Sequence, residues 1–213
     1  MNPEEVLVPN RREFLAISLA SSSALPIMTS ERREDAPSLE NSKSQCVRSG
    51  AVIVEMTSPL ALAFRAEADK CGLLAHGIHD DITDLWYRHL DLQWRTAPAT
   101  LAGITLSTSL FCLETFARDY GMRVWFRAIH KNSPDGPAEY VLSGDERLVE
   151  QAAALDGGWP AAFARFATAV PLVEPGKFHQ KTVETAAPPP EEPGPMVSWI
   201  IAPRLKSQSS PIS

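Results

Sequence analysis

Apolar residues recur at helical spacing along two neighbouring stretches of the chain, residues 58–96 and 101–120. The first stretch places its apolar residues on one helical face and its acids on the other. That apolar face comprises Leu74, Ile78, Ile82, Leu85, His89 and Leu92. Ser58 and Pro59 suit the cap and the first position of this helix, although Gly72 and Gly77 predict that it is bent or divided. The second stretch is apolar around most of its circumference and ends at Gly121.

The two stretches meet at residues 98–103, which read Pro-Ala-Thr-Leu-Ala-Gly. A proline-containing turn between two periodic segments predicts a long helical hairpin over residues 58–121. A helix that is apolar on so many sides must be covered by other elements or by a second copy of the chain. The pattern therefore predicts self-association through the second hairpin helix as one possibility.

Shorter elements are expected on both sides of this hairpin. Residues 51–56 are rich in β-branched side chains and favour a strand. Residues 122–130 alternate apolar and polar positions, and residues 139–142 follow a strong turn signal, so a small β-hairpin is expected. A capping box at Ser143 and a Trp-Pro start at position 159 predict two short C-terminal helices.

These elements predict a mainly α domain over residues 51–170. A polar linker is expected at residues 31–50, and a Pro-rich, largely disordered tail at residues 171–213. Within that tail, residues 196–201 form an apolar island, Met-Val-Ser-Trp-Ile-Ile. The island is expected either to dock on the domain as an edge strand or to bind a partner protein as a short motif.

The chain is acidic, with a net charge of −6 and a pI near 5.4. This balance argues against a nucleic-acid partner, because Lys and Arg supply most of the affinity for phosphate backbones. Arginines alternate with aromatic residues at positions 123–127, and the acidic balance favours an ordinary strand there over a platform for single-stranded nucleic acid. Three cysteines at positions 46, 71 and 112 form no disulfide framework, and Cys112 is expected in the core.

The N-terminal residues 1–30 contain Arg11 and Arg12, followed by Phe14, Leu15 and a mildly apolar run. This pattern resembles a twin-arginine export signal, although Glu4 is unusual in a leader sequence and no Ala-x-Ala cleavage site follows. The resemblance implies a periplasmic protein. The alternative is a cytoplasmic protein whose N-terminal residues form an amphipathic helix. The apolar run is too short for a stable membrane span.

One cluster of metal-ligating side chains occurs in the predicted first helix. His76, Asp80 and Asp84 follow one another at helical-turn spacing, and His79 lies on an adjacent face. Imidazoles and carboxylates together suit a divalent transition metal. Ordinary solvated residues on a helix surface are the alternative, because no HExxH motif is present. His89, on the apolar face, is expected to be a hydrogen-bonded core residue.

The sequence contains no nucleophile elbow, phosphate-binding loop or dinucleotide fingerprint. Its Pro-x-Thr-Leu-Ala-Gly turn, preceded by Trp94 and Arg95, resembles that of short uncharacterised alphaproteobacterial helical proteins. The resemblance implies a helical hairpin and no activity. The sequence thus favours a non-catalytic interaction or assembly protein, and a metal-binding or metal-dependent periplasmic protein is the alternative. The identity of any cofactor stays unknown from the sequence.

Overall fold

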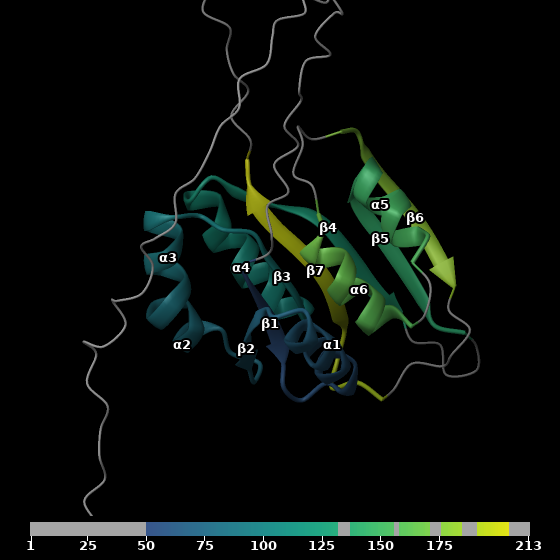
Figure 1. Ribbon diagram of the computed structural model, residues 1–213, viewed down its shortest axis with the longest axis horizontal. Helices are drawn as coiled ribbons and strands as arrows, with labels where there is room; N and C mark the ends of the chain where they lie inside the picture. Colours follow the sequence, from purple (N-terminus) through teal and green to yellow (C-terminus); the bar gives the residue numbers. More distant parts are fainter. Residues whose placement is uncertain (1–49, 132–136, 156–157, 171–175, 185–190, 205–213) are drawn as a thin grey trace, which may run out of the picture. The chain divides into compact units, whose positions relative to one another are not determined.

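The computed structural model describes residues 50–131, 137–155, 158–170, 176–184 and 191–204. In these residues, seven strands form one mixed sheet in the order β2-β1-β3-β7-β4-β5-β6 (Figure 1). The strands are β1 (Ala51–Glu55), β2 (Leu74–Ile78), β3 (Leu101–Leu106), β4 (Met122–Lys131), β5 (Glu139–Asp145), β6 (Phe178–Glu184) and β7 (Met196–Pro203). The helical segments are α1 (Pro59–Lys70), α2 (Thr83–Leu85), the π-helix η1 (Trp86–Leu90), α3 (Asp91–Thr96), α4 (Ser107–Asp119), α5 (Glu146–Ala153) and α6 (Trp159–Thr168). The protein is therefore an α/β protein, and the prediction of a mainly α fold is wrong.

The first half of the sheet is parallel. Strand β1 pairs in parallel with both β2 and β3, and helical segments connect these strands. Strand β7 then lies antiparallel between β3 and β4. Strands β5 and β6 extend the antiparallel half to its edge.

Helices cover both faces of the sheet (Figure 1). Side chains of α1, α5 and α6 share one apolar core with Val52 and Val54 of β1. Side chains of α2, η1, α3 and α4 share a second core with Ile53 of the same strand. Alternate residues of a strand point to opposite faces, so β1 is buried on both sides.

The predicted second hairpin helix divides into a strand and a helix. Its first six residues form β3, whose neighbours β1 and β7 approach so closely that a Cβ atom at Gly103 would lie 2.6 Å from the Ile53 carbonyl oxygen. A strand buried on both faces reads as a continuous apolar run and shows no alternation. The helical hairpin over residues 58–121 is therefore wrong, and residues 98–100 lead into a strand.

The predicted first hairpin helix divides as well. Helix α1 begins as expected, with the Ser58 hydroxyl accepting a hydrogen bond from the Ala61 amide at 3.0 Å. Gly72, with a φ of 74°, follows the end of this helix, and β2 begins two residues later. The expected apolar face is broken, because Leu74 is 62% exposed and Leu92 is 66% exposed.

Most of the apolar surface of α4 is covered within the chain. Leu110, Leu113 and Ala117 are buried in the second core, whereas Phe111 is 69% exposed. The covered surface removes most of the reason to expect self-association through this helix. Cys112 is exposed, so its expected place in the core is wrong.

The β-hairpin and both short helices are present where the sequence predicts them. Strands β4 and β5 pair in antiparallel fashion, and α5 and α6 follow. The cap of α5 differs from the prediction, because Ser143 belongs to β5 and Asp145 accepts the hydrogen bond from the Arg147 amide at 3.1 Å.

The segment predicted to be a disordered tail contains two strands. Strand β6 forms one edge of the sheet, and β7 forms its centre. The apolar island thus docks on its own domain, as a central strand and not as an edge strand. Trp199 of β7 is fully buried and donates a hydrogen bond to Thr105 Oγ1 at 3.0 Å. These buried residues offer no short motif to a partner.

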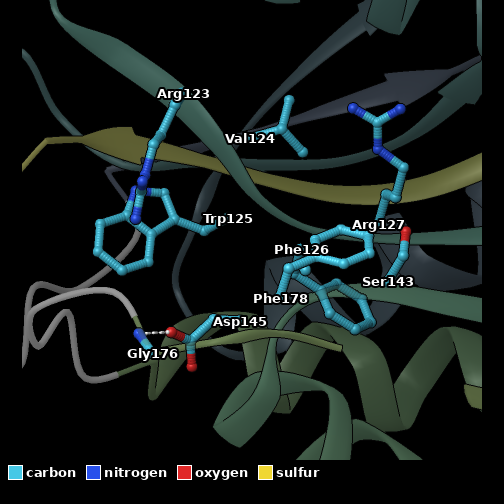
Figure 2. Close-up of a pocket in the computed structure, with 10 residues that line it drawn as sticks. Arg123, Val124, Trp125, Phe126, Arg127, Ser143, Asp145, Gly176 and Phe178 are labelled. Atoms are coloured by element: carbon cyan, nitrogen blue, oxygen red, sulfur yellow. Dashed lines mark hydrogen bonds between the residues drawn. The ribbon is translucent and has the colours of Figure 1, made fainter. Parts of the chain in front are cut away.

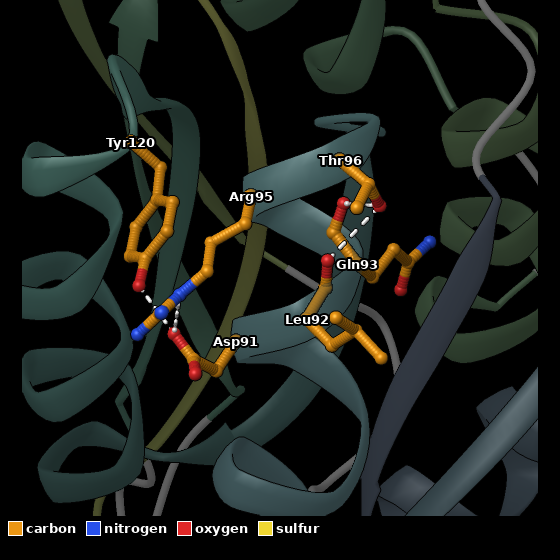
Figure 3. A network of polar contacts seen from close by, with 6 residues as sticks. All are labelled: Asp91, Leu92, Gln93, Arg95, Thr96 and Tyr120. Carbon is orange, nitrogen blue, oxygen red and sulfur yellow. Dashed lines mark hydrogen bonds and ion pairs between the residues drawn. The ribbon is translucent and has the colours of Figure 1, made fainter.

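A polar network ties α3 to the end of α4. Asp91 Oδ1 accepts hydrogen bonds from the Tyr120 hydroxyl and, at 2.9 Å, from Arg95 Nε (Figure 3). The bond from Tyr120 is the main cause that lowers the pKa of Asp91. The Tyr120 ring also packs edge-on against Trp86 and Trp94. This network therefore holds α3 against the end of α4.

Among the described residues, each helix is too short or too polar to cross a membrane. The leader-like residues 1–30 and residues 31–49 of the predicted linker, with Cys46, lie outside the described residues.

Candidate functional site

The four residues predicted to bind a metal do not share a helix face. His76 lies in β2, His79 forms an isolated bridge with Asp81, and Asp84 lies in α2. Asp80 adopts a φ of 63°, and its amide donates a hydrogen bond to Glu55 Oε2 at 3.2 Å. Within the part of the chain that the structure describes, no group of three or more His, Cys, Asp and Glu side chains is arranged to hold a metal ion.

The structure nevertheless gathers three of the four around two adjoining hollows. His76 and Asp84 line a hollow of 290 Å³, and His79 and Asp84 line a second one of 280 Å³. The ring of His89 lies 5.2 Å from that of His76, measured between centroids. His89 is exposed, so its expected place in the core is wrong. Burial lowers the pKa of His76, and the neighbouring His89 lowers it further.

Ligands of open α/β sheets usually bind at the carboxyl ends of the parallel strands. In this protein, hydrogen-bonded residues of the chain itself occupy the space at the carboxyl ends of the parallel strands. The carboxylate of Glu55 accepts a hydrogen bond from Thr57 Oγ1 at 2.9 Å, and Ser107 Oγ donates to the Pro195 carbonyl at 3.0 Å. Glu192 Oε1 accepts a hydrogen bond from the Leu60 amide at the start of α1. The segment that leads into β7 thus spans the usual ligand position.

A larger groove of 370 Å³ lies at the start of β4. We call it the Arg123 groove (Figure 2). It is lined by Arg123, Val124, Trp125, Phe126, Arg127, Ser143, Gly144, Asp145, Gly176 and Phe178. Three strands and the segment before β6 contribute to it, so the groove exists only in the folded chain.

A β-bulge shapes this groove. The pairing of β4 with β7 shifts its register between Val124 and Phe126, which leaves Trp125 as the extra residue. Trp125 and Phe126 both pack in the first core, although they are consecutive. Gly144, opposite the bulge, has a φ of 141°, and a Cβ atom there would overlap the Trp125 carbonyl oxygen. Glycine is therefore required at this position.

Positive charge dominates one side of the groove. The Arg123 guanidinium lies over the Trp125 ring, with its Cζ atom 4.2 Å from the ring centroid (Figure 2). Burial lowers the pKa of Arg123, repulsion from Arg204 lowers it further, and Asp145 opposes the shift. Arg127 differs, because it pairs with Glu114 at 3.1 Å. Among the described residues, Arg123 makes no ion pair with a carboxylate.

The opposite side of the groove is polar and aromatic. Asp145 is already engaged, since its carboxylate accepts hydrogen bonds from the Arg147 and Gly176 amides. Phe178 at the start of β6 is 75% exposed. Within the described part of the chain, the groove therefore offers a cation without an ion-pair partner beside an exposed aromatic side chain, which suits an anion with an apolar body.

A buried serine and histidine lie elsewhere in the sheet, with the spacing of a nucleophile and its base. His130 Nε2 is 2.8 Å from Ser198 Oγ, and Trp159 Nε1 donates to the same oxygen at 2.9 Å. Ser198 is fully buried, and His130 Nδ1 has no hydrogen-bond partner among the residues that the structure describes. Burial lowers the pKa of His130 to about 3. Because Ser198 is fully buried and no described residue orients the imidazole, these contacts act as a structural link between β4, β7 and α6.

Sequence reasoning missed two features of these sites. It assigned residues 123–127 to an ordinary strand, and nothing in their spacing indicates the bulge or the approach of Arg204 from the far end of β7. It also placed His89 in the core. For the bulge, the available signal was Gly144, which pairs opposite it in β5, because a glycine inside a strand often marks a bulge. Comparison with protein-family models, with curated proteins and with solved structures gives no match for the chain.

Proposed function

We propose that this protein is a non-catalytic binding protein, and that the Arg123 groove takes a small anion with an aromatic or apolar group. The observation that carries the proposal is the Arg123 guanidinium, which is held over Trp125 and makes no ion pair with any carboxylate of the described residues. A guanidinium fixed in this way keeps its N–H groups for a carboxylate or a phosphate. Phe178 supplies the apolar surface for the rest of the ligand.

The groove lacks the groups that would make it an active site. Its acid, Asp145, caps α5, and its hydroxyl residue, Ser143, lies beside no histidine among the lining residues. General acid–base or nucleophilic catalysis needs a pair of such groups within hydrogen-bond reach. Recognition without chemistry is thus the function that these side chains support best.

The replacement Arg123→Gln tests the groove. Phenyl phosphate should bind the full chain more tightly than inorganic phosphate, because it also contacts Phe178. Loss of a charge-assisted hydrogen bond costs about 1.5–3 kcal/mol, so Arg123→Gln should weaken phenyl phosphate binding about tenfold or more. Isothermal titration calorimetry measures both affinities.

The control is Arg65→Gln, which removes an arginine of α1 that is paired with Asp69 at 3.8 Å. This variant should bind phenyl phosphate like the original chain. Equal affinities of the Arg123→Gln variant and the original chain would refute the proposal, as would the absence of binding by any of these anions.

Self-association through α4 is a second proposal with less support. It rests on Phe111, because Leu110 and Leu113 are buried in the second core and Phe116 is partly buried against it. A single mass for the monomer in light scattering would remove it. A periplasmic location, implied by the resemblance at Arg11 and Arg12, stays a prediction for N-terminal sequencing of fractionated cells.

A further inference from the structure

A second arginine lies beside the Arg123 groove. Arg204 follows the last residue of β7, and its amide donates a hydrogen bond to the Gly121 carbonyl at 2.9 Å. This bond continues the pairing of β4 with β7 one position beyond Met122 and Pro203. Because the residue opposite Arg204 is a glycine, no cross-strand side chain covers the position that Arg204 occupies.

The strand register places Arg204 on the same face of the sheet as Arg123. Arg123 pairs with Ala202, which is buried in the first core together with Trp125. Alternate residues of a strand share a face, so Arg204 lies diagonally across the ladder from Arg123. Long side chains reach one another over such a diagonal. Repulsion from Arg204 accordingly helps to lower the pKa of Arg123, after the larger effect of burial.

The carboxylates of the described residues leave this pair of cations without an ion-pair partner. Asp145 is the acid that acts on Arg123, and its carboxylate already accepts hydrogen bonds from the Arg147 and Gly176 amides. Within the described ranges, neither Arg123 nor Arg204 forms an ion pair with a carboxylate. Two like charges therefore lie side by side at one end of the groove.

Two neighbouring guanidinium groups distinguish anions by their charge. The attraction of an anion to each guanidinium is proportional to the charge of the anion, so a dianion gains about twice as much as a monoanion of the same shape. A phosphate monoester carries a charge of about −1.5 to −2 near neutral pH and has three acceptor oxygens. Guanidinium groups match the geometry of those oxygens.

We propose that Arg204 is a second anchor of the Arg123 groove and gives it a preference for a dianionic head group, namely a phosphate monoester on an aromatic or apolar small molecule. The inference rests on the proposed function and adds the charge of the ligand to it. Arg204 is exposed and does not line the empty groove. Its long side chain can turn towards an anion that Arg123 holds.

Phenyl phosphate and phenyl sulfate test this preference, because they share the ring and the tetrahedral head group and differ in charge. Calorimetry with the full chain at about pH 7.5 should show tighter binding of phenyl phosphate. Arg204→Gln should weaken phenyl phosphate binding about tenfold and phenyl sulfate binding about threefold, so the preference should fall about threefold. Arg204→Lys keeps the charge and should keep most of the preference.

The matched control is Arg88→Gln, which removes an exposed arginine of η1 that pairs with Asp84 at 3.4 Å and should leave both affinities unchanged. The Arg204 variants keep the amide bond to Gly121, so circular dichroism should show a folded chain. An unchanged preference in Arg204→Gln, while Arg123→Gln still weakens binding, would overturn this inference and leave the proposed function intact. Equal losses in Arg88→Gln would also overturn it. Absence of binding by either ligand would remove both proposals.

Discussion

Replacement of Gly144 by alanine should lower the free energy of unfolding by about 3 kcal/mol or more. Two effects add at this position. A φ of 141° is strained for any residue with a side chain, and the new Cβ atom would overlap the Trp125 carbonyl oxygen and lie 2.9 Å from Phe126 Cα. Backbone atoms of a paired strand cannot rotate away. Relief of the overlap would separate β5 from the bulge in β4.

Urea denaturation of the full chain measures this effect, and Gly72→Ala is the control. Gly72 also has a positive φ, of 74°, but nothing lies within 4 Å of a Cβ atom added there. That replacement should cost about 1–2 kcal/mol, the ordinary cost of a left-handed residue. Equal losses for the two variants would show that the overlap with Trp125 contributes nothing. The Gly144→Ala variant should also lose phenyl phosphate binding, because the bulge shapes the Arg123 groove.

The second large effect is a loss of stability in acid, caused by His130. Its pKa is lowered from 6.5 to about 3 by burial, whereas the unfolded chain has the ordinary value. Between these values, the unfolded chain binds a proton that the folded chain does not. The free energy of unfolding should therefore fall with pH from 6.5 towards 3, by up to about 1.4 kcal/mol per pH unit from this residue.

The variant His130→Asn separates this contribution from that of the carboxylates. It should be less stable at pH 7, because the ring packs against Tyr140 at 4.7 Å between centroids and bonds Ser198. Its stability should fall less steeply below pH 6.5 than that of the original chain. His179→Gln, which alters an imidazole with a 40% exposed side chain beside Glu150, is the control and should keep the steep dependence. Parallel pH profiles for His130→Asn and the original chain would rule out the role of His130.

Gly144 serves both stability and the Arg123 groove, whereas the buried contacts of His130 lie in another part of the same sheet. The Ser198 hydroxyl links β7 to His130 of β4 and to Trp159 of α6, inside the first core. The Arg123 groove lies at the start of β4. Variants of Arg123 should therefore change ligand binding with little effect on unfolding, because this half-buried side chain lies outside both apolar cores.

Several elements were predictable because neighbouring residues decide them. The Ser58 cap and Pro59 start of α1 depend on groups within one helical turn. The alternation in β4 and the turn signal before β5 predict their pairing, and Trp-Pro at position 159 predicts the start of α6. In each case, the physical cause lies within a few positions of the chain.

The sites were less predictable, because their residues meet through the sheet. His76 and Asp84 were predicted to bind a metal ion from one helix face, but the helix assumed for them is a strand, a loop and a short helix. His89 was assigned to an apolar face that does not exist. Arg123 was recognised beside aromatic residues, but its lack of a carboxylate partner among the described residues depends on which strands surround it.

The sequence by itself determined the local starts, stops and pairings: the cap at Ser58, the strand at β1, the hairpin of β4 and β5, and helix α6. The tertiary structure decided that residues 101–106 form a strand and that β7 enters the centre of the sheet between β3 and β4. A strand buried on both faces carries no alternation, and a run of buried apolar residues fits a helix equally well. Contacts with distant strands, such as the approach of Trp199 to Gly103, resolve that ambiguity.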